Sequence, residues 1–372
     1  MTVKKVVSLG QAAMEKLGLG LVKLPVVMKH YYLVTRAWIL YTIRHDKSPK
    51  EFLAGLTSGF RPKYYYILGL DQKPSDLHVS RDSFEYIGGD YPGPIMSVNE
   101  NARFVLNDKI AVYNIFSELS ERFPTLYATV HDGEYNSEDG GDTQSVIQAV
   151  ERYGTVAMKP IDGQQGDDFY KISKQGDTLL INGEVSSASE IEEICTQSEY
   201  SHFMLTEYIT QHEYADRINP SAVNSIRLLT VFDTERGEHY VARAGHRFGT
   251  EESHPVDNFE NGGVIAPIDP ETGEMDALVT LDEDGNRARL DRHPDTESKV
   301  TGKTIPMWDE VTSIALKGAT SYPHAKIIGW DFVVTDDGPM ILEASAQPGP
   351  TIPQVERGLL KDPVVRQMIE SA

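Results

Sequence analysis

Residues 328–349 read IGWDFVVTDDGPMILEASAQPG and contain the clearest strand and turn pattern in the sequence. Ile327–Val334 is rich in β-branched and aromatic residues and predicts a strand, and Met340–Glu343 predicts the returning strand. Between them, Asp336-Asp337-Gly338 predicts a three-residue turn in which the glycine takes the left-handed conformation. In this register Val334 opposes Met340.

Two carboxylates then lie side by side on one face of the hairpin. Counting outward from the turn, Asp331 opposes Glu343, and directly opposed residues share a face of the sheet. Two negative charges at this separation repel each other unless a cation lies between them, and hard oxygen ligands suit Mg²⁺. These residues alone leave two interpretations open, a magnesium site and a solvated acidic hairpin without a ligand.

The composition narrows the class of protein. A chain of 372 residues with 40% hydrophobic and 24% charged residues is typical of a soluble enzyme with two or three packed units. The formal net charge of −21 argues against general binding to nucleic acid, which needs clustered Lys and Arg. The single cysteine, Cys195, excludes an intramolecular disulfide and fits a reducing compartment, so we expect a cytoplasmic protein. Nothing in the sequence indicates an oligomeric state.

The segment 16–45 is a cationic region in an acidic protein. It contains basic residues but no Asp or Glu, and no uncharged apolar run in it reaches the length of a spanning helix. One interpretation is an interfacial helix that makes peripheral contact with anionic lipid. The other, which we favour, is a helical arm that docks on the acidic body of the protein.

The coarse order of elements indicates a mixed α and β protein. Ser48-Pro49 predicts the start of a helix, because a serine cap is followed by proline at the first helical position. A Gly- and Pro-rich stretch, 87–94, separates the helical N-terminal part from the rest. Further predicted elements are helices at Asn107–Arg122 and Trp308–Ala319 and strands at Thr155–Lys159, Phe203–Ile209, Ser225–Asp233, Glu238–Phe248 and Val264–Asp269.

Two strand ends have residues suited to a nucleotide. Lys159 ends a strand and runs into a loop with Gly163 and Gly166, where an ammonium and bare backbone N–H groups suit a phosphate. The spacing is not that of a Walker motif, and a plain turn is the alternative. Glu207 ends another apolar strand and suits an adenine amino group, although a surface glutamate is equally compatible. The residues that follow, among them Glu213, lie within reach of a ribose.

Several polar groups fall within apolar strands of the second half. Arg227 needs an anionic partner there, either a protein carboxylate or a ligand phosphate, because an unpaired guanidinium is costly to bury. Arg243 and His246 fall in a similar position, and Arg243 with Arg247 indicates an anionic acceptor. The following loop, with Asp257-Asn258 and Gly262-Gly263, presents polar groups and bare backbone that suit a ligand.

In their order along the chain, from about Asn107 to Gly349, these features resemble the ATP-grasp superfamily. The closer resemblance is to the sugar-transfer-associated ATP-grasp proteins, formerly grouped as related to alpha-L-glutamate ligases and often linked with exopolysaccharide biosynthesis. It implies an α+β, ATP-grasp fold in which two α+β subdomains clasp ATP. The implied domains are a helical N-terminal arm at 1–94, a lid subdomain at 95–206 and a C-terminal subdomain at 207–372.

The resemblance also implies roles for particular residues. Lys109 and Lys159 resemble the nucleotide-phosphate lysines and Asp162–Gly166 the phosphate lid, although Asp167 and Asp168 stand where basic or small residues are usual. Asp331 and Glu343 resemble the magnesium ligands, with Ser345 where the family usually has asparagine. The resemblance also implies an adenine hinge at Glu207, Tyr208 and Ile209, a contact of Arg227 with the transferred phosphoryl group, and a family signature at Asp257-Asn258. From the residues themselves we also expect a nucleotide contact by Glu213, catalytic contacts by Lys159 and Arg243, and substrate contacts by Asp257, Asn258 and His246.

The implied reaction uses ATP and Mg²⁺ to join a small carboxylate to an amine through an acyl phosphate, which is amide-bond formation. Phosphoryl transfer needs positioning and charge neutralisation, which the lysines, Arg227 and the metal would supply. Two alternatives remain from the sequence. A kinase on the same fold would phosphorylate a hydroxyl, and a nucleotide-binding regulator without turnover would account for the serine at 345.

Overall fold

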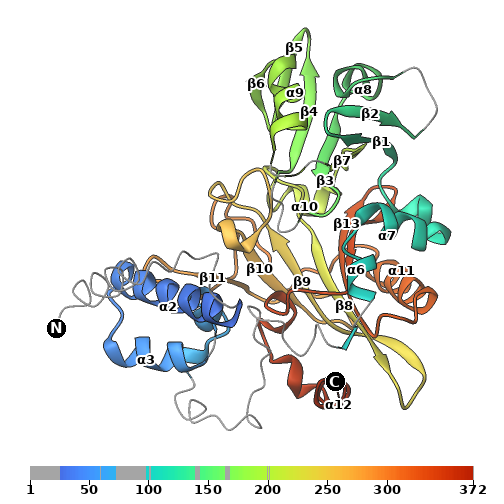
Figure 1. The fold of residues 1–372 in the computed structure, drawn as a ribbon. Coiled ribbons are helices and arrows are strands. Elements are labelled where there is room, and N and C mark those ends of the chain that lie inside the picture. The colour runs from blue at the N-terminus through green and yellow to red at the C-terminus, as the bar shows by residue number, and fades with distance from the viewer. Residues whose placement is uncertain are drawn as a thin grey trace. The chain divides into compact units, whose positions relative to one another are not determined.

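The structure is a computed structural model that describes residues 26–58, 60–72, 98–99, 102–138, 143–163, 168–198, 200 and 202–371. It divides into two compact units. The first comprises Met1–Ser97, Val279–Leu290 and Gly349–Ala372, and the second comprises Val98–Leu278 and Asp291–Pro348. Figure 1 labels the elements. The segment 87–94, the basic residues of 16–25 and Gly166 lie outside the described residues, and the domain boundaries expected from the sequence remain predictions.

The first unit is mainly helical. Its core contains Trp38, whose indole N–H donates to the carbonyl of Phe60 at 2.8 Å. A Cβ on Gly55 would lie 1.8 Å from the Trp38 ring, so this close approach of helix and ring requires glycine. The elements are α2 (Val26–Arg44), α3 (Pro49–Ser58), α4 (Pro62–Ile67), η2 (Leu70–Gln72), β12 (Arg287–Leu290), η7 (Ile352–Gln354), η8 (Leu359–Lys361) and α12 (Pro363–Glu370).

The start of α3 confirms the predicted cap. Ser48 Oγ accepts from the backbone N–H of Glu51, and the Glu51 carboxylate accepts from the N–H of Ser48, which satisfies two N–H groups at the helix start. Among the described residues no helix combines the length and the apolar character that a membrane span requires.

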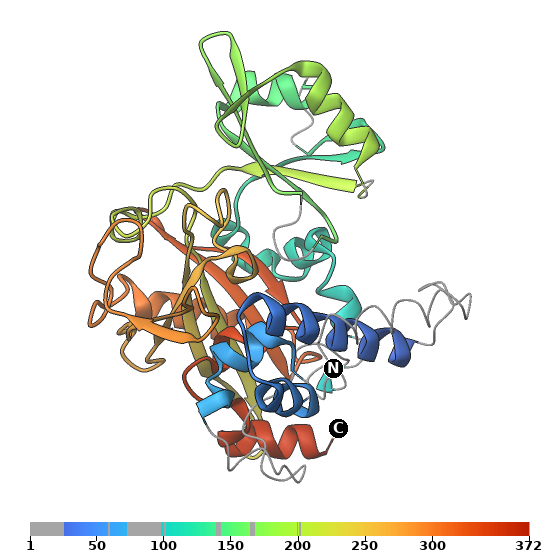
Figure 2. The ribbon, with the colours of Figure 1, turned by 90° about the vertical axis from the view of Figure 1, so that its left-hand side faces the viewer.

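The second unit contains two sheets, and the first has seven strands in the order β2-β1-β7-β3-β4-β5-β6. One face of this sheet packs against two helices around a core that includes Val150, Met158, Ile191 and Phe203, as the views in Figures 1 and 2 show. The elements are β1 (Leu126–His131), β2 (Glu134–Ser137), α8 (Val146–Tyr153), β3 (Val156–Pro160), β4 (Tyr170–Gln175), β5 (Thr178–Ile181), β6 (Glu184–Ser186), α9 (Ala188–Gln197) and β7 (His202–Glu207).

In the second sheet, β10, β9, β8, β13 and β14 lie next to one another in this order, and each neighbouring pair is antiparallel. Its strands agree with the predicted ones to within one or two residues, because their alternating and apolar runs are long. They are β8 (Ile226–Asp233), β9 (Glu238–Phe248), β10 (Val264–Ile268), β13 (Ile327–Thr335) and β14 (Gly338–Ser345); β11 (Leu278–Leu281) follows β10 in the chain.

The helix α11 (Trp308–Ser321) packs closely on this sheet, since a Cβ on Gly318 would lie 2.5 Å from the ring of Trp330. The predicted helix at 107–122 is shorter than expected. It ends at Ile115 and is followed by a 3₁₀ segment. The shorter elements of this unit are α6 (Ala102–Val105), α7 (Lys109–Ile115), η5 (Ser117–Arg122), α10 (Glu213–Asp216) and η6 (Phe259–Asn261).

The β13–β14 hairpin corrects the predicted turn. Thr335 pairs with Gly338 and Val334 pairs with Pro339, so the turn contains two residues and the register near the tip is shifted by one. The reason lies in the Thr335 hydroxyl, which donates to the carbonyl of Gly338 at 2.8 Å and accepts from the N–H of Asp337 at 3.2 Å. Gly338 has a φ of +123°, which confirms that the turn needs a glycine there.

A β-bulge then restores the register further along the hairpin. Phe332 pairs with Ile341, but Asp331 pairs with Glu343, so Leu342 is the extra residue on β14. The predicted pairing of Asp331 with Glu343 is therefore confirmed. Two details of the prediction were wrong, since the turn is one residue shorter than predicted and β14 contains one extra residue, and their effects on the register cancel.

Candidate active site

Two lysines converge on the hairpin and on the loop after β3. Lys159, near the end of β3, donates from Nζ to the carbonyl of the bulge residue Leu342 at 3.2 Å. Lys109, the first residue of α7, is buried and donates from Nζ to the carbonyl of Gly163 at 2.6 Å. Both ammonium groups are therefore held by backbone oxygens of the second unit.

The lysines and the carboxylate pair lie within electrostatic reach of one another. Burial and, as a smaller cause, the neighbouring Lys109 lower the pKa of Lys159 to about 8, while Glu343 and Asp331 act in the opposite direction. The structure thus brings together four of the residues predicted from the sequence. They come from α7, from β3 and from the two strands of the hairpin.

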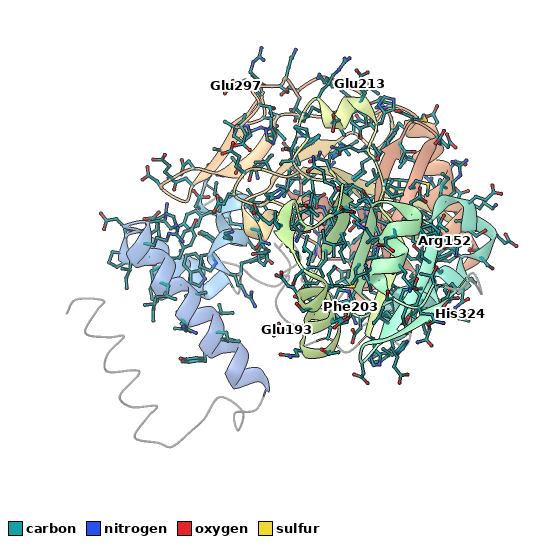
Figure 3. All side chains as sticks on the ribbon, turned by 90° about the horizontal axis from the view of Figure 1, so that it is seen from above. Arg152, Glu193, Phe203, Glu213, Glu297 and His324 are labelled. Atoms are coloured by element: carbon teal, nitrogen blue, oxygen red, sulfur yellow. The ribbon has the colours of Figure 1, made fainter. Side chains whose placement is uncertain are left out.

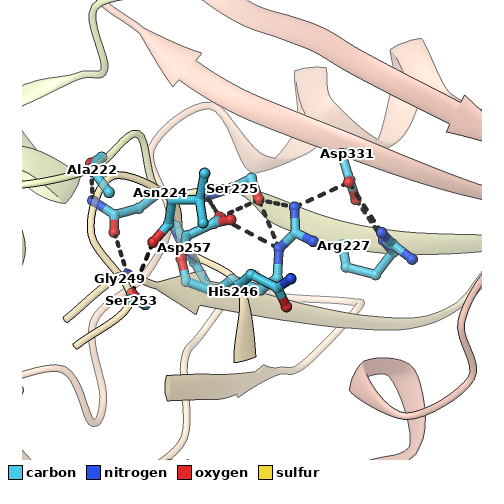
Figure 4. A network of polar contacts seen from close by, with 12 residues as sticks. Ala222, Asn224, Ser225, Arg227, His246, Gly249, Ser253, Asp257 and Asp331 are labelled. Carbon is cyan, nitrogen blue, oxygen red and sulfur yellow. Dashed lines mark hydrogen bonds and ion pairs between the residues drawn. The ribbon is translucent and has the colours of Figure 1, made fainter. Parts of the chain in front are cut away.

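Asp331 is held by two arginines. Its Oδ1 accepts from Arg227 Nε at 2.5 Å, and its Oδ2 accepts from Arg227 Nη2 and from Arg247 Nη2, each at 3.0 Å (Figure 4). Arg227 lies directly opposite Asp331 on β8, so the bidentate contact follows from the strand register. Burial alone would raise the pKa of Asp331, but the two guanidinium groups outweigh it and hold the pKa below the ordinary aspartate value.

Arg247 links this pair to a second buried carboxylate. Its Nε lies 3.4 Å from Oδ2 of Asp257, which also accepts from the backbone N–H and the hydroxyl of Ser225 at 2.8 and 2.5 Å. Arg227, Asp331, Arg247 and Asp257 therefore form a chain of alternating charges, shown in part in Figure 4. We call it the ion-pair chain.

The loop that carries Asp257 has a close-packed backbone. Asn258 accepts from the N–H of Glu260 at 2.9 Å through its side chain and so caps η6. A Cβ on Gly263 would lie 2.6 Å from the carbonyl of Asp257, which explains the glycine at this position. Asp257 and Asn258, predicted as substrate contacts, thus have side-chain partners within the protein.

A magnesium ion would find a limited set of ligands here. Within the part of the chain that the structure describes, no group of three or more His, Cys, Asp or Glu side chains is arranged to hold a metal ion. Asp331 shares its oxygens with two guanidinium groups, and Ser345 Oγ accepts from the N–H of Gln347 at 3.1 Å. One or two carboxylates suit a Mg²⁺ that arrives with nucleotide phosphates and keeps several waters. Asp331, Glu343 and Ser345 fit that mode rather than a preformed metal cage.

The predicted adenine hinge follows β7. The Glu207 carboxylate accepts from the N–H and the hydroxyl of Thr125 at 3.3 and 3.2 Å, so it already has protein partners. Ile209 is buried, and Tyr208 has Lys171 Nζ 4.4 Å from its ring centroid. Glu213 lies at the surface, where Arg217 donates to it (Figure 3).

His246 is fully buried beneath the ion-pair chain. Its Nδ1 lies 3.0 Å from the carbonyl of Arg247, and its Nε2 lies 2.8 Å from the hydroxyl of Tyr214. Burial lowers the pKa of His246 to about 3, so the ring is neutral. Because a carbonyl only accepts, Nδ1 carries the proton and Tyr214 donates to Nε2. Arg243 Nη1 donates to the carbonyl of Ala242 at 2.6 Å.

Sequence reasoning missed a polar network beside the ion-pair chain. The Asn224 side chain accepts from the N–H of Gly249 at 2.9 Å (Figure 4). It also donates to Gln211 Oε1 at 2.9 Å, so it joins two loops to the start of β8. Ser225, which bonds Asp257 and Arg247, was also missed. The available signal was that Asn224 and Ser225 lie close before Arg227 in the sequence, separated from it by Ile226.

Solved structures resemble this chain only distantly. D-cycloserine synthetase DcsG is 16% identical, with 73% of this chain and 71% of that chain covered and a TM-score of 0.39. D-alanine–D-alanine ligase from Bacillus anthracis is 11% identical, with 72% and 67% covered and a TM-score of 0.37. L-amino acid ligase from Bacillus licheniformis is 9% identical, with 66% and 41% covered and a TM-score of 0.35.

No curated protein matches the chain. A family model described as sugar-transfer associated ATP-grasp, in contrast, matches residues 95–367, which is more than half of the chain. This match identifies the fold as ATP-grasp and confirms the predicted α+β class, in agreement with the helices and antiparallel sheets described above. The protein therefore belongs to the sugar-transfer associated ATP-grasp family.

Proposed function

We propose that this protein is an enzyme, an ATP-dependent ligase that joins a carboxylate to an amine. The observation that supports it most directly is the grouping of two lysines with a carboxylate pair: Lys159 donates to the hairpin that carries Asp331 and Glu343, and Lys109, which donates to the loop after β3, lies within electrostatic reach of Lys159. Cations for a triphosphate and carboxylates for its metal ion are what phosphoryl transfer requires. Such a grouping is informative in a chain with a net charge of −21, whose overall field repels ATP.

The proposed reaction has two steps. In the first, the γ-phosphoryl group of ATP moves to an oxygen of the substrate carboxylate, which gives ADP and an acyl phosphate. In the second, the amine nitrogen attacks the acyl carbon, the bond to the phosphate oxygen breaks, and the nitrogen loses a proton. The products are an amide, ADP and phosphate. Given the family's description, we propose that one substrate is a sugar derivative, such as an exopolysaccharide precursor.

Each site residue predicted from the sequence has a proposed role in this reaction. Lys109 and Lys159 neutralise the phosphates, and Arg227, oriented by Asp331, contacts the transferred phosphoryl group. Mg²⁺, held by Asp331, Glu343 and the Ser345 hydroxyl, would supply further charge neutralisation. Gly163, Gly166, Glu207, Tyr208, Ile209 and Glu213 remain proposed nucleotide contacts, Arg243 a proposed catalytic contact, and Asp257, Asn258 and His246 proposed substrate contacts. Because the reaction consumes ATP, we also propose a cytoplasmic location.

The test is a magnesium-dependent ADP-release assay with pairs of acids and amines, in which mass spectrometry identifies the product. The proposal expects free phosphate and an amide only when both substrates are present. Lys159→Ala and Glu343→Ala should abolish turnover, whereas Lys174→Ala, on an exposed lysine of β4 that pairs with Glu151, should not.

Three results would contradict the proposal. Phosphate retained on a hydroxyl acceptor would indicate a kinase. ATP binding without turnover across the whole panel would indicate a regulator. Unchanged turnover in Lys159→Ala or Glu343→Ala would remove the site from the reaction.

A further inference from the structure

A second polar feature of the same unit is a cavity of about 450 Å³, distinct from the lysine and arginine cluster. One side is formed by Tyr170 of β4 and by Asp168, Phe169 and Asn182, which lie in the loops next to β4 and β5. The other is formed by residues 252–256 with Glu260 and Asn261, from the loop between β9 and β10. This volume lies within the range of small-molecule sites.

The charge of the cavity is opposite to that of the phosphate site. Asp168, Glu252 and Glu260 contribute carboxylates, while no Lys or Arg is among the described residues that line it. Such a lining repels a triphosphate and attracts a cation. Two of the three substrates of the proposed ligase differ in this way, because ATP is anionic and an amine enters as an ammonium ion.

Asp168 is held in place as an acceptor. Its Oδ1 accepts from the hydroxyl of Tyr170 at 3.0 Å, and its Oδ2 accepts from the hydroxyl of Ser198. Each oxygen keeps a further lone pair, so the carboxylate can still bind an ammonium group. The aspartate that departs from the basic or small residues expected in the phosphate lid thereby finds a role in a different site.

The neutral part of the lining suits a hydroxylated ring. Asn182, Asn261 and Ser253 contribute amide and hydroxyl groups, and Phe169, Tyr170 and Pro255 contribute apolar faces. Aromatic and apolar faces with a few polar groups at the edge are the usual composition of a small-molecule site. An amino sugar combines a cation, hydroxyl groups and apolar ring faces in this volume.

The cavity loop is also joined to the phosphate site. Val256 lines the cavity, and the next residue, Asp257, bonds Ser225 and lies beside Arg247, which in turn donates to Asp331. A ligand that orders the loop would therefore act on the carboxylate of the hairpin through residues already in contact. Asp257 and Asn258 do not line the cavity, but their contacts within the protein hold the loop that does.

We propose that this cavity binds the amine substrate, and that the substrate is an amino sugar whose ammonium group is bound by Glu252, Glu260 and Asp168. This proposal rests on the proposed ligase function in one respect, because the bound amine is a reactant only if the protein is a ligase. Binding itself does not depend on turnover, so the two can be tested separately.

The binding test uses the full-length protein without ATP and ligand-observed NMR titration. The probes are D-glucosamine, D-galactosamine and D-mannosamine, each compared with its N-acetyl derivative, which keeps the ring but lacks the charge. We expect at least one free amine to bind about tenfold more tightly than its acetylated form, as for a hydrogen bond to a charged group. Absence of binding by all three amines, or equal binding of both forms, would overturn the proposal.

Variants locate the binding to the cavity. Glu252→Gln and Glu260→Gln should each weaken binding of that amine about tenfold, because a neutral amide replaces a charged acceptor. Glu251→Gln is the matched control, since Glu251 is exposed, adjacent in sequence and outside the lining. Unchanged affinity in both cavity variants would also overturn the proposal.

The ADP-release assay separates the two failures. If amines bind but no acid supports ADP release, the cavity assignment stands and the ligase function fails. If ADP release depends on an amine but the cavity variants keep the wild-type KM for it, the ligase function stands and the cavity assignment fails.

Discussion

Lys159 Nζ donates a 3.2 Å hydrogen bond to the carbonyl of Leu342, the residue that the β-bulge adds to β14. The bulge therefore does two things at one place. It returns Glu343 to its position opposite Asp331, and it leaves a backbone carbonyl unpaired in the ladder, where it accepts from a lysine of the other sheet. The carboxylate pair and Lys159 are positioned by the same irregularity.

The activity should fall at alkaline pH. Because the pKa of Lys159 is lowered to about 8, its ammonium group is present below that pH and is lost above it. The value of kcat/KM for ATP reports groups of the free enzyme and should decrease above about pH 8. A pH series measured with saturating acid and amine checks this, and Lys159→Arg should keep its activity to higher pH. An unchanged alkaline limb in that variant would assign the titration to another group.

The same group makes a separate prediction for stability. The unfolded chain holds the Lys159 proton up to the ordinary lysine pKa of 10.5, whereas the folded protein releases it at a pKa of about 8. Between these values the unfolded state binds more protons, so the contribution of Lys159 to the free energy of unfolding should increase with pH. Lys159→Met should remove this contribution, as measured by urea unfolding of both proteins at several pH values.

The ion-pair chain should be strongly coupled. Asp257→Ala leaves Arg247 buried with one carboxylate fewer, and breaking a buried pair from one side costs about 3 kcal/mol or more. Arg247→Met should cost a similar amount, and the double variant should lose clearly less than the sum, because neither charge then remains alone. Denaturant unfolding of the four proteins gives the coupling free energy. Additive losses would show that the two side chains act independently.

Gly263 should not tolerate a side chain. A Cβ there would lie 2.6 Å from the carbonyl of Asp257 and 3.0 Å from the carbonyl of Asn258, and backbone atoms cannot move aside as a flexible side chain can. Gly263→Ala should lower the free energy of unfolding by about 1–3 kcal/mol, the usual cost of overpacking. Gly349→Ala is the control, since its Cβ would meet nothing within 4 Å. Equal unfolding midpoints for both variants would show that the loop can move aside.

Magnesium should bind together with the nucleotide and not before it. Asp331 is shared with two arginines, so Mg²⁺ alone should leave the thermal unfolding midpoint unchanged. ATP with Mg²⁺ should raise it, by an amount equivalent to about 2.7 kcal/mol when ATP is present at 100 times its Kd. Adding EDTA should reverse most of the increase. A large shift with Mg²⁺ alone would indicate a preformed metal site.

The period of the strands made the fold and the carboxylate pair predictable. Side chains alternate along a strand, but the pairing of Asp331 with Glu343 was predicted correctly only because the extra residue at the bulge offsets the turn, which is one residue shorter than predicted. The turn depends on the hydroxyl of Thr335, which the prediction from Asp336-Asp337-Gly338 did not consider. The bulge lies where a lysine from a distant strand contacts Leu342, and a local pattern cannot contain such information.

The anionic partner of Arg227 could not be predicted from the sequence either. An arginine within an apolar strand required an anion, but a protein carboxylate and a phosphate satisfy that need equally well. Only the pairing of β8 with β13 shows that Arg227 meets Asp331. The cavity was not predicted at all, since Asp168 and Glu252 are far apart in the chain and come from loops.

The alternating order of the ion-pair chain has a consequence for how the site would fill. Its two positive and two negative side chains cancel, so neither a free anion nor a free cation meets an uncompensated charge there. A phosphoryl group that draws Arg227 away would release an oxygen of Asp331, and the released oxygen is what a divalent ion needs. Binding of the phosphoryl group and binding of the divalent ion would thus each promote the other. Binding of either ligand alone would be disfavoured.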